Sequence, residues 1–172
     1  MDAGKTMYDY HGWAMQALLD HLASLPADVM TKEVRSSYPS ITKTISHVHA
    51  VDMMWLKVLE GTGLQEALQE SMGRLAVTET FSVAEFKDAF DQSTASYRSL
   101  IETRSDLDHT IMVDNPWSGS RETSTEEILL HVANHGSYHR GNITTMLRQI
   151  DEASIMMDYS LFWYEDVKQE SR

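Results

Sequence analysis

The sequence predicts an all-α fold: a four-helix bundle with a short extra C-terminal helix, forming a single domain over residues 1–172. Three observations support this. Four long stretches carry apolar residues at three- and four-residue spacing, which is the period of an amphipathic helix. Proline and glycine are scarce, at three and eight residues, so few positions interrupt a helix. A chain of 172 residues has the size of one domain with one hydrophobic core.

The first two helical stretches have recognisable ends. The first runs from about Tyr8 to Leu25 and stops before Pro26, which cannot continue a helix. The second opens after Ser40, whose hydroxyl can cap a helix N-terminus. It continues to Gly61, a residue that can end a helix in the left-handed conformation.

The third and fourth helices each begin with a capping box, in which a serine is followed three residues later by glutamate. Ser82 and Glu85 open the third helix. Ser124 and Glu127 open the fourth, which runs to about Ile150. Short or moderate connections between four such helices predict an antiparallel bundle, with any metal or ligand site between facing helices.

Three shorter segments complete the chain. Residues 62–77 are ambiguous and are interpreted as a short helix and a loop. Residues 109–123 predict an extended piece and a turn, because Asn-Pro and Ser-Gly interrupt them. Residues 158–167 are the candidate for the short, aromatic-rich C-terminal helix.

Composition excludes several functional classes. The formal net charge is −12 and no run of basic residues occurs, which argues against binding to nucleic acid. The chain has no Cys, which excludes disulfides, thiolate metal ligands and a cysteine nucleophile. No apolar run approaches the roughly 18–20 residues of a membrane span, and the N-terminus lacks a signal-peptide pattern. We therefore expect a soluble, cytoplasmic protein that does not engage a membrane.

The fourth helix carries histidines at four-residue spacing: His131, His135 and His139. This spacing stacks side chains near one face of a helix, and the neighbouring apolar residues indicate that this face is inward. A buried polar group without a partner costs roughly 1–3 kcal/mol. Two interpretations follow, a hydrogen-bonded histidine network and a metal site in which two imidazoles converge on one ion.

A metal site needs a third ligand, and the second helix offers His47 and His49. Two residues on a helix are separated by a rotation of about 200°, so only one of the two can face the core. His47 shares a largely apolar stripe, whereas His49 lies near the polar side that holds Asp52. We therefore predict His47 as the third ligand.

Other motifs for metal, nucleotide or serine chemistry are missing from the sequence. Glycine follows His135, so the H-E-x-x-H motif of metalloproteases is absent. Neither the E-x-x-H pairs of di-iron bundles nor a phosphate-binding loop occurs. The G-x-S-x-G elbow of serine hydrolases is absent as well, although this does not exclude a serine-centred triad.

Three stretches of the chain resemble a known protein family. They are "DYHGWAMQALLDHLASLP", "SITKTISHVHAVDMMWLKVLEG" and "EEILLHVANHGSYHRGN". The last resembles a motif whose usual form is N-H-x-x-H-H-R-G-Q. Over nearly its whole length the chain is similar to the DinB/YfiT-like superfamily of metal-dependent enzymes, which is unrelated to the DNA polymerase that shares the DinB name. Tyr138 and Asn142 depart from the motif, where His and Gln are common.

The resemblance implies roles for individual residues. It places the metal ligands at His47, His135 and His139. His131 then lies in the pocket or in the core. Asn134 and Arg140 belong to the motif and are interpreted as making helix-end and inter-helix hydrogen bonds. Asp52 is interpreted either as the partner that orients a ligand histidine or as a solvated carboxylate. Three aromatic residues are expected in the core: Tyr10, Trp13 and Trp55.

The resemblance also implies an activity. Characterised members include thiol-dependent transferases and an isomerase that use a small cellular thiol as cosubstrate. The chain is thus interpreted as a divalent-metal-binding protein, with zinc or nickel favoured, in which the metal activates a small-molecule thiol toward an electrophile. The alternatives are a metal-dependent hydrolase and a non-catalytic, stress-related metal-binding protein. The sequence assigns no catalytic residue, and a homodimer is expected.

Overall fold

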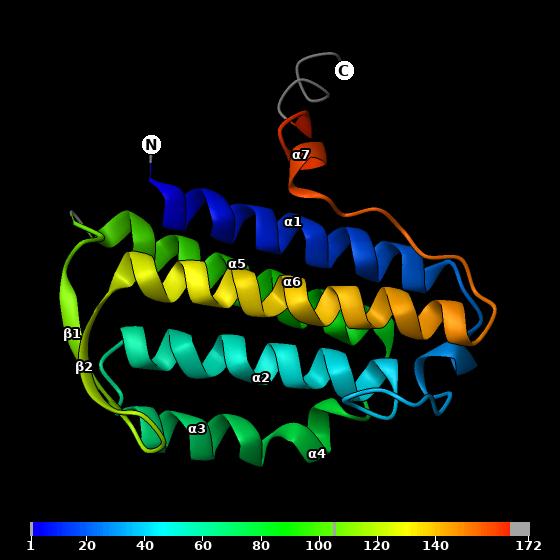
Figure 1. Cartoon of the computed structure of the whole chain (residues 1–172), viewed down its shortest axis with the longest axis horizontal. Helices are drawn as coiled ribbons and strands as arrows, with labels where there is room; N and C mark the ends of the chain where they lie inside the picture. The colour runs from blue at the N-terminus through cyan, green and yellow to red at the C-terminus, as the bar shows by residue number, and fades with distance from the viewer. Residues whose placement is uncertain (1, 105, 166–172) are drawn as a thin grey trace.

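The computed structural model describes residues 2–104 and 106–165, and the chain in these ranges is mostly helical with one small two-stranded sheet (Figure 1). The all-α prediction fits broadly, but it omitted the sheet. The four long helices lie where the sequence predicts them: α1 (Ala3–Ala23), α2 (Ile41–Leu59), α5 (Val83–Thr103) and α6 (Thr125–Gln149).

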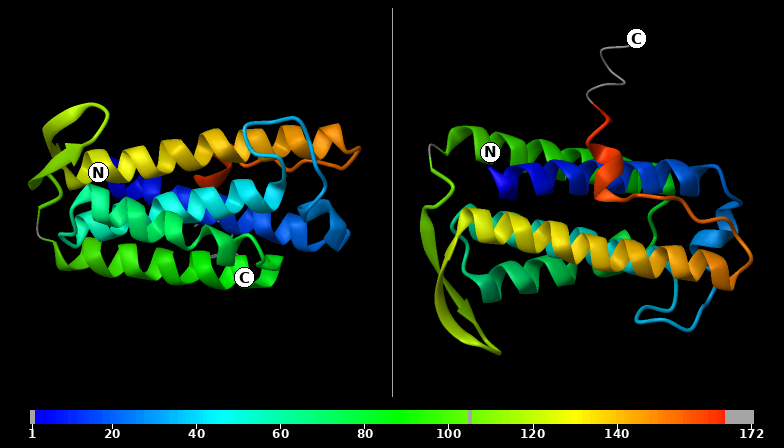
Figure 2. Two further views of the ribbon diagram at one scale, coloured as in Figure 1. Left: turned by 90° about the horizontal axis from the view of Figure 1, so that it is seen from below. Right: turned by 45° about the horizontal axis from the view of Figure 1, so that its top comes forward.

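These four helices lie side by side along the long axis of the molecule (Figures 1 and 2). Helix α1 packs against α5 and α6, and helix α2 packs against the same two helices from the other side. The largest hydrophobic cluster gathers residues of all four, with Leu18, Ile45, Phe86 and Ile143 among its buried members. Side chains that point inward from α2 and α6 therefore meet inside the molecule.

The predicted helix ends are confirmed by their hydrogen bonds. The hydroxyl of Ser40 accepts a hydrogen bond from the backbone N–H of Lys43. Both capping boxes are present, at Ser82 with Glu85 and at Ser124 with Glu127. Gly61 has a φ of 104° and ends α2 in a Schellman motif, which satisfies carbonyl groups of the last turn.

The start of α1 differs from the prediction. The helix begins at Ala3 rather than near Tyr8, because the side chain of Asp2 accepts a hydrogen bond from the N–H of Lys5 and caps the helix there. The apolar pattern alone could not locate this end, because the first turn carries mainly polar and small residues.

The short segments fold into small elements around the four helices. A 3-10 helix, η1 (Ala27–Met30), follows α1. The ambiguous segment forms α3 (Leu64–Gly73) and α4 (Leu75–Thr78). The extended piece is an antiparallel hairpin of β1 (Thr110–Asn115) and β2 (Gly119–Ser124), with Val113 opposite Arg121. The C-terminal helix α7 (Tyr159–Phe162) is confirmed but short, and residues 166 and 167 of the predicted segment lie outside the described ranges.

Helices α3 and α4 pack against α2 on the side away from α6 (Figure 1). Helix α2 is consequently buried on more than one face, and most of its residues are inaccessible to solvent. Within the described ranges, none of the helices has an apolar stretch of the length needed to traverse a lipid bilayer.

Candidate metal centre

Three histidines from two helices converge on one point. His47 comes from α2, and His135 and His139 come from successive turns of α6. One potential ligand atom of each side chain lies within 4.8 Å of those of the other two. The Nε2 atoms of His47 and His135 are 3.1 Å apart, and the His139 ring centroid lies 4.8 Å and 4.5 Å from those of His47 and His135. The structure thus brings together the three residues that the sequence predicts.

The electrostatic environment keeps these imidazoles neutral. Burial, reinforced by the neighbouring His139, lowers the pKa of His135 to about 3. Burial and the proximity of His47 lower the pKa of His139 to about 4. Burial also lowers the pKa of His47, although Asp52 opposes the shift. Neutral imidazole is the form that binds a metal ion, so all three side chains are ready to act as ligands at neutral pH.

The hydrogen bonding of the cluster is incomplete. The Nδ1 atoms of His135 and His139 are buried and have no hydrogen-bond partner within the described part of the chain. An unsatisfied buried polar group costs roughly 1–3 kcal/mol, and a saturated histidine network would not leave two such atoms. A divalent ion with a preference for imidazole nitrogen, such as zinc or nickel, fits this set of donors.

Two tyrosines flank the cluster. The Tyr38 ring stacks on His47 at a centroid distance of 4.7 Å, and it also approaches His139. The Tyr138 ring meets His139 edge-on at 4.9 Å and is 60% exposed. Burial raises the pKa of Tyr38, with a contribution from Tyr138, so its hydroxyl keeps its proton at neutral pH. The two phenols form aromatic walls beside the histidines.

His131 does not join the cluster. Its side chain is exposed and packs edge-on against Trp55, with ring centroids 5.2 Å apart. The prediction of a single inward stripe was wrong for His131, because each four-residue step advances about 40° around a helix and two steps accumulate about 80°. Asn134 and Tyr138 are also exposed on α6, whereas Asn142 is half-buried.

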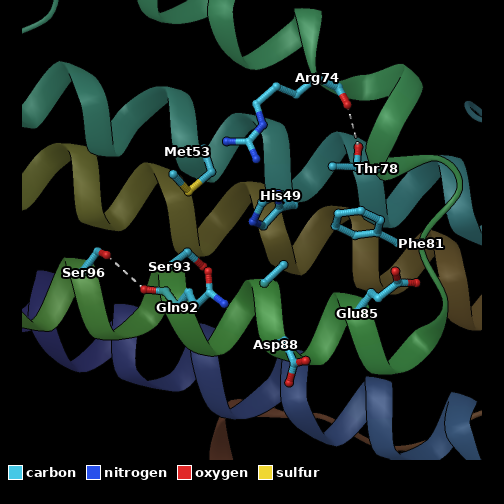
Figure 3. Close-up of a pocket in the computed structure, with 11 residues that line it drawn as sticks. His49, Met53, Arg74, Thr78, Phe81, Glu85, Asp88, Gln92, Ser93 and Ser96 are labelled. Atoms are coloured by element: carbon cyan, nitrogen blue, oxygen red, sulfur yellow. Dashed lines mark hydrogen bonds between the residues drawn. The ribbon is translucent and has the colours of Figure 1, made fainter.

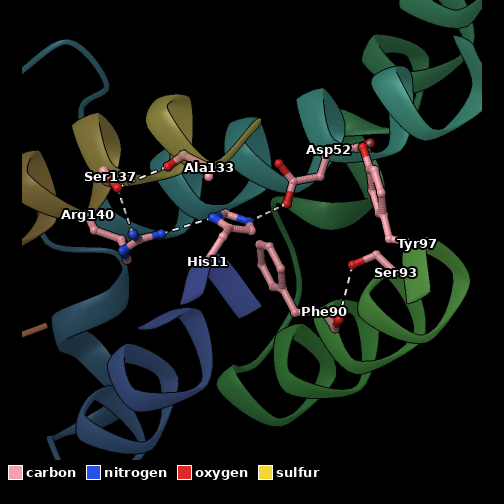
Figure 4. A network of polar contacts seen from close by, with 8 residues as sticks. All are labelled: His11, Asp52, Phe90, Ser93, Tyr97, Ala133, Ser137 and Arg140. Carbon is pink, nitrogen blue, oxygen red and sulfur yellow. Dashed lines mark hydrogen bonds and ion pairs between the residues drawn. The ribbon is translucent and has the colours of Figure 1, made fainter. Parts of the chain in front are cut away.

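A second polar cluster lies beside the first, and its members are joined by hydrogen bonds through His11 (Figure 4). Within the described residues, the Oδ1 atom of Asp52 is buried and has no hydrogen-bond partner. The Nε2 atom of His11 on α1 lies 2.8 Å from Asp52 Oδ2 on α2. The Nη1 group of Arg140 on α6 lies 3.0 Å from His11 Nδ1, and Nη2 donates to Ser137. A guanidinium can only donate, so His11 Nδ1 accepts and its Nε2–H donates to the carboxylate. The neutral imidazole therefore bridges a buried cation and a buried anion.

This second cluster, the His11–Asp52–Arg140 network, links three helices at the level of the metal candidate. The side chains of His11, Asp52 and Arg140 are at most 2% exposed. Gly136, next to His135, makes room for the network, because a Cβ atom there would lie 2.2 Å from His11 Nδ1. The network therefore helps to fix the positions of α2 and α6 relative to each other.

The network settles several open interpretations. Asp52 is neither solvated nor bonded to a predicted ligand, because its carboxylate bonds to His11. Arg140 makes the expected inter-helix hydrogen bonds. Sequence reasoning missed His11, although its position on α1 between buried Tyr8 and Met15 places it on the inward stripe.

The position of His49 also differs from the prediction. His49 is buried, at 9% exposure, and packs edge-on against Phe90 of α5. The face expected to be polar is covered by α3, α4 and α5. Of the aromatic residues expected in the core, Tyr10 is buried, whereas Trp13 and Trp55 are half-buried.

Comparison with known proteins agrees with this architecture. The sequence profile described as "DinB family" matches residues 1–171. A curated relative, the protein DinB of Bacillus subtilis (strain 168), is 37% identical over 158 residues, and the match covers 92% of each chain. The similarity thus extends over all the elements that carry the two histidine clusters.

Proposed function

The chain belongs to the DinB family, and we propose that it is a divalent-metal-binding protein that transfers a small-molecule thiol to an electrophile. The observation that carries the proposal is the convergence of three histidines whose pKa values are lowered, so that all three are neutral at neutral pH. We propose His47, His135 and His139 as the metal ligands, in a four-helix bundle that occupies residues 1–172 as one domain.

The three histidine ligands suit an ion that keeps an open coordination position for a further ligand. Three protein ligands that leave an open coordination position are typical of catalytic zinc sites, whereas structural sites have four. His47 is only half-buried, so the cluster is accessible from the side of Tyr38 and Tyr138. A divalent ion held there supplies the positive charge that lowers the pKa of an approaching thiol.

The residues of the chain have defined tasks in this proposal. The three imidazoles stay neutral because burial lowers their pKa, so they do not repel an ion. Tyr38 holds the ring of His47 by stacking and keeps its phenolic proton, which is available for a hydrogen bond to the electrophile. The chain has no Cys, so the sulfur nucleophile must come from a cosubstrate.

The proposed reaction can be written for an activated aromatic halide. The thiol loses its proton to solvent, a carbon–sulfur bond forms, and the carbon–halogen bond breaks with release of halide. A small unsaturated diacid is a second class of electrophile, in which sulfur adds to the double bond and a proton is taken up at carbon. Neither reaction needs an oxidant or a reductant.

The experiment uses cobalt-substituted protein and several low-molecular-weight thiols. Thiol binding should add a sulfur-to-metal charge-transfer band, and product formation should require both metal and thiol. The His139→Ala variant should lose the band, whereas the His131→Ala variant, changed on the same helix outside the cluster, should keep it. If no thiol perturbs the cobalt spectrum, the transferase proposal fails, and a metal-dependent hydrolase or a non-catalytic metal-binding protein takes its place.

Three further proposals rest on the sequence. Zinc or nickel is the favoured ion, because neutral imidazole suits both. The protein is proposed to act in the cytoplasm, without nucleic acid or membrane partners. A homodimer is proposed as the assembly, and sedimentation of the purified protein distinguishes it from a monomer.

A further inference from the structure

Helix α2 carries polar sites on two opposite faces. His47 points to the metal candidate, and His49 lies two residues further, which turns it by about 200° around the helix. The His49 side chain faces a separate cavity of about 310 Å³ between α2, α4 and α5 (Figure 3). None of the predicted metal ligands lines this cavity.

We propose that this second cavity binds a small organic monocarboxylate with a compact apolar body. The carboxylate is held by Arg74, and the body lies against Met53, Phe81 and Ala89. The site is independent of the proposed thiol chemistry, because α2 separates the two.

Buried polar side chains concentrate around the cavity. His49, Thr78 and Ser93 line it, and all three are at most 9% exposed. A small adjoining cavity shares His49 and Thr78 and is also lined by Ser71, which is 3% exposed. The Oγ atom of Ser71 has no hydrogen-bond partner among the described residues. Such a group is costly to bury, and a polar ligand or the water that accompanies it would satisfy it.

Arg74 supplies the charge that selects the ligand. It lies at the end of α3 and is exposed to solvent, and its guanidinium points into the cavity toward His49 (Figure 3). This side chain makes no hydrogen bond or ion pair with any residue in the described ranges. A guanidinium presents paired N–H donors that match the two oxygens of a carboxylate.

Two carboxylates at the cavity limit the charge of the ligand. Glu85 is engaged by the N–H and the hydroxyl of Ser82 in the helix cap, each at 2.7 Å. Asp88 is exposed and points away from Arg74 (Figure 3). With one guanidinium and two carboxylates in the lining, a doubly charged phosphate is repelled more strongly than a singly charged carboxylate. Among anions, this balance favours a single charge over a double charge.

The apolar part of the lining sets the shape of the ligand. Met53 comes from α2, Phe81 precedes α5 and Ala89 lies within α5. A volume of about 310 Å³ is at the lower end of the range for small-molecule sites. A single ring or a short branched chain attached to the carboxylate suits these walls.

The test is an NMR titration of the full chain with 3-phenylpropionate, alongside its neutral amide and inorganic phosphate. We expect saturable shifts at His49, Arg74 and Ala89, with binding at least about tenfold weaker for the amide and for phosphate. Arg74→Gln should weaken 3-phenylpropionate binding at least about tenfold, because it removes a charge-assisted hydrogen bond. Arg35→Gln, a change of an exposed arginine outside the cavity, should have no effect.

Two further variants separate this site from the other cluster and from a loss of folding. Ala89→Leu fills the cavity with a good helix former and should abolish binding while the thermal unfolding stays cooperative. His47→Ala should leave the shifts at Arg74 unchanged, because it lies on the opposite face of α2. The proposal is overturned if 3-phenylpropionate gives no saturable shifts, if Arg74→Gln binds as the wild type does, or if phosphate or the amide binds equally well.

Discussion

The two histidine clusters of this protein lie side by side and differ in how their imidazole nitrogens are bonded. In the His11–Asp52–Arg140 network, both nitrogens of the imidazole have partners, and the buried charges of Asp52 and Arg140 are bridged by His11. In the metal candidate, His135 and His139 each keep a buried nitrogen without a partner in the described ranges. Both clusters use side chains of α2 and α6.

The difference separates a positioning cluster from a binding cluster. The buried charges that His11 bridges stabilise one arrangement of the helices, because moving either of them leaves the other unpaired. The unpaired buried nitrogens of His135 and His139 cost stability in the metal-free protein, a cost that is expected at functional sites. The first cluster thus holds α1, α2 and α6 in the arrangement that brings the second together.

The largest expected effect comes from breaking the positioning network. Asp52→Ala removes the partner of His11 and leaves the buried Arg140 charge uncompensated. Loss of one partner of a buried pair costs about 3–5 kcal/mol, so urea unfolding of the metal-free protein should shift by this amount. Asp52→Asn keeps the shape and an acceptor, and it should cost less. If Asp52→Ala unfolds like the wild type, the network does not stabilise the helices.

A pair of glycines on α6 gives the next largest contrast. Gly136→Ala places a Cβ atom 2.2 Å from His11 Nδ1, and overpacking of this kind costs about 1–3 kcal/mol. Gly141→Ala is the matched control, because nothing lies within 4 Å of a Cβ there. That change should stabilise the helix by roughly 0.5–1 kcal/mol. Chemical denaturation measures the change in the free energy of unfolding for both variants. Equal changes in the two variants would contradict the close packing at His11.

In the binding cluster, we expect a substitution to raise the stability of the metal-free protein rather than lower it. His135→Leu removes a buried nitrogen without a partner and replaces the ring with an apolar side chain. The metal-free variant should be more stable than the wild type by about 1 kcal/mol, because the unsatisfied group carries a penalty. The same urea titration as for Asp52→Asn provides the measurement. A destabilised His135→Leu would show that this histidine serves the fold.

The pH dependence of the metal-free protein tests the lowered pKa values of the binding cluster. The unfolded chain binds a proton at each histidine below a pKa of about 6.5, whereas folded His135 and His139 have pKa values of about 3 and about 4. Between these values the unfolded state holds more protons, so stability falls as the pH drops from about 6.5 toward 3. Urea midpoints from pH 7 to 5 should fall less in His135→Leu than in the wild type. Equal slopes would exclude a lowered pKa at His135.

The pH dependence of metal affinity should reflect the same lowered pKa values. The ordinary histidine pKa would place proton competition between about pH 7 and 5. Because burial lowers the pKa of all three predicted ligands, we expect competition to set in at lower pH. Calorimetric titration with zinc across this interval measures the onset.

Sequence patterns predicted the parts of the molecule that depend on local chemistry. Ser82 with Glu85 and Ser124 with Glu127 marked helix starts, because a capping box is a local hydrogen-bond pattern. His135 and His139 were predicted together because the helical repeat alone brings them to one face. His47 needed one further argument, the 200° rotation that separates it from His49.

Features that depend on packing between distant segments could not be predicted. His11 contacts Asp52, which is 41 residues away in the sequence, and Arg140, which is 129 residues away. The spacing of residues within one helix does not predict contacts between such distant residues. His49 was assigned to a polar face because the cover formed by α3 and α4 was not foreseen. His131 follows the same spacing as the ligands, and only the structure shows that its ring packs against Trp55 outside the cluster.

The central claim is that His47, His135 and His139 together hold one divalent ion. Equilibrium dialysis against zinc, followed by elemental analysis, tests it in the wild type and in single alanine variants of the three residues, with His131→Ala as the matched control on α6. The account predicts a full equivalent of zinc in the wild type and in His131→Ala, and well below one equivalent in each of the other three variants. Full occupancy in His47→Ala, His135→Ala or His139→Ala would contradict it.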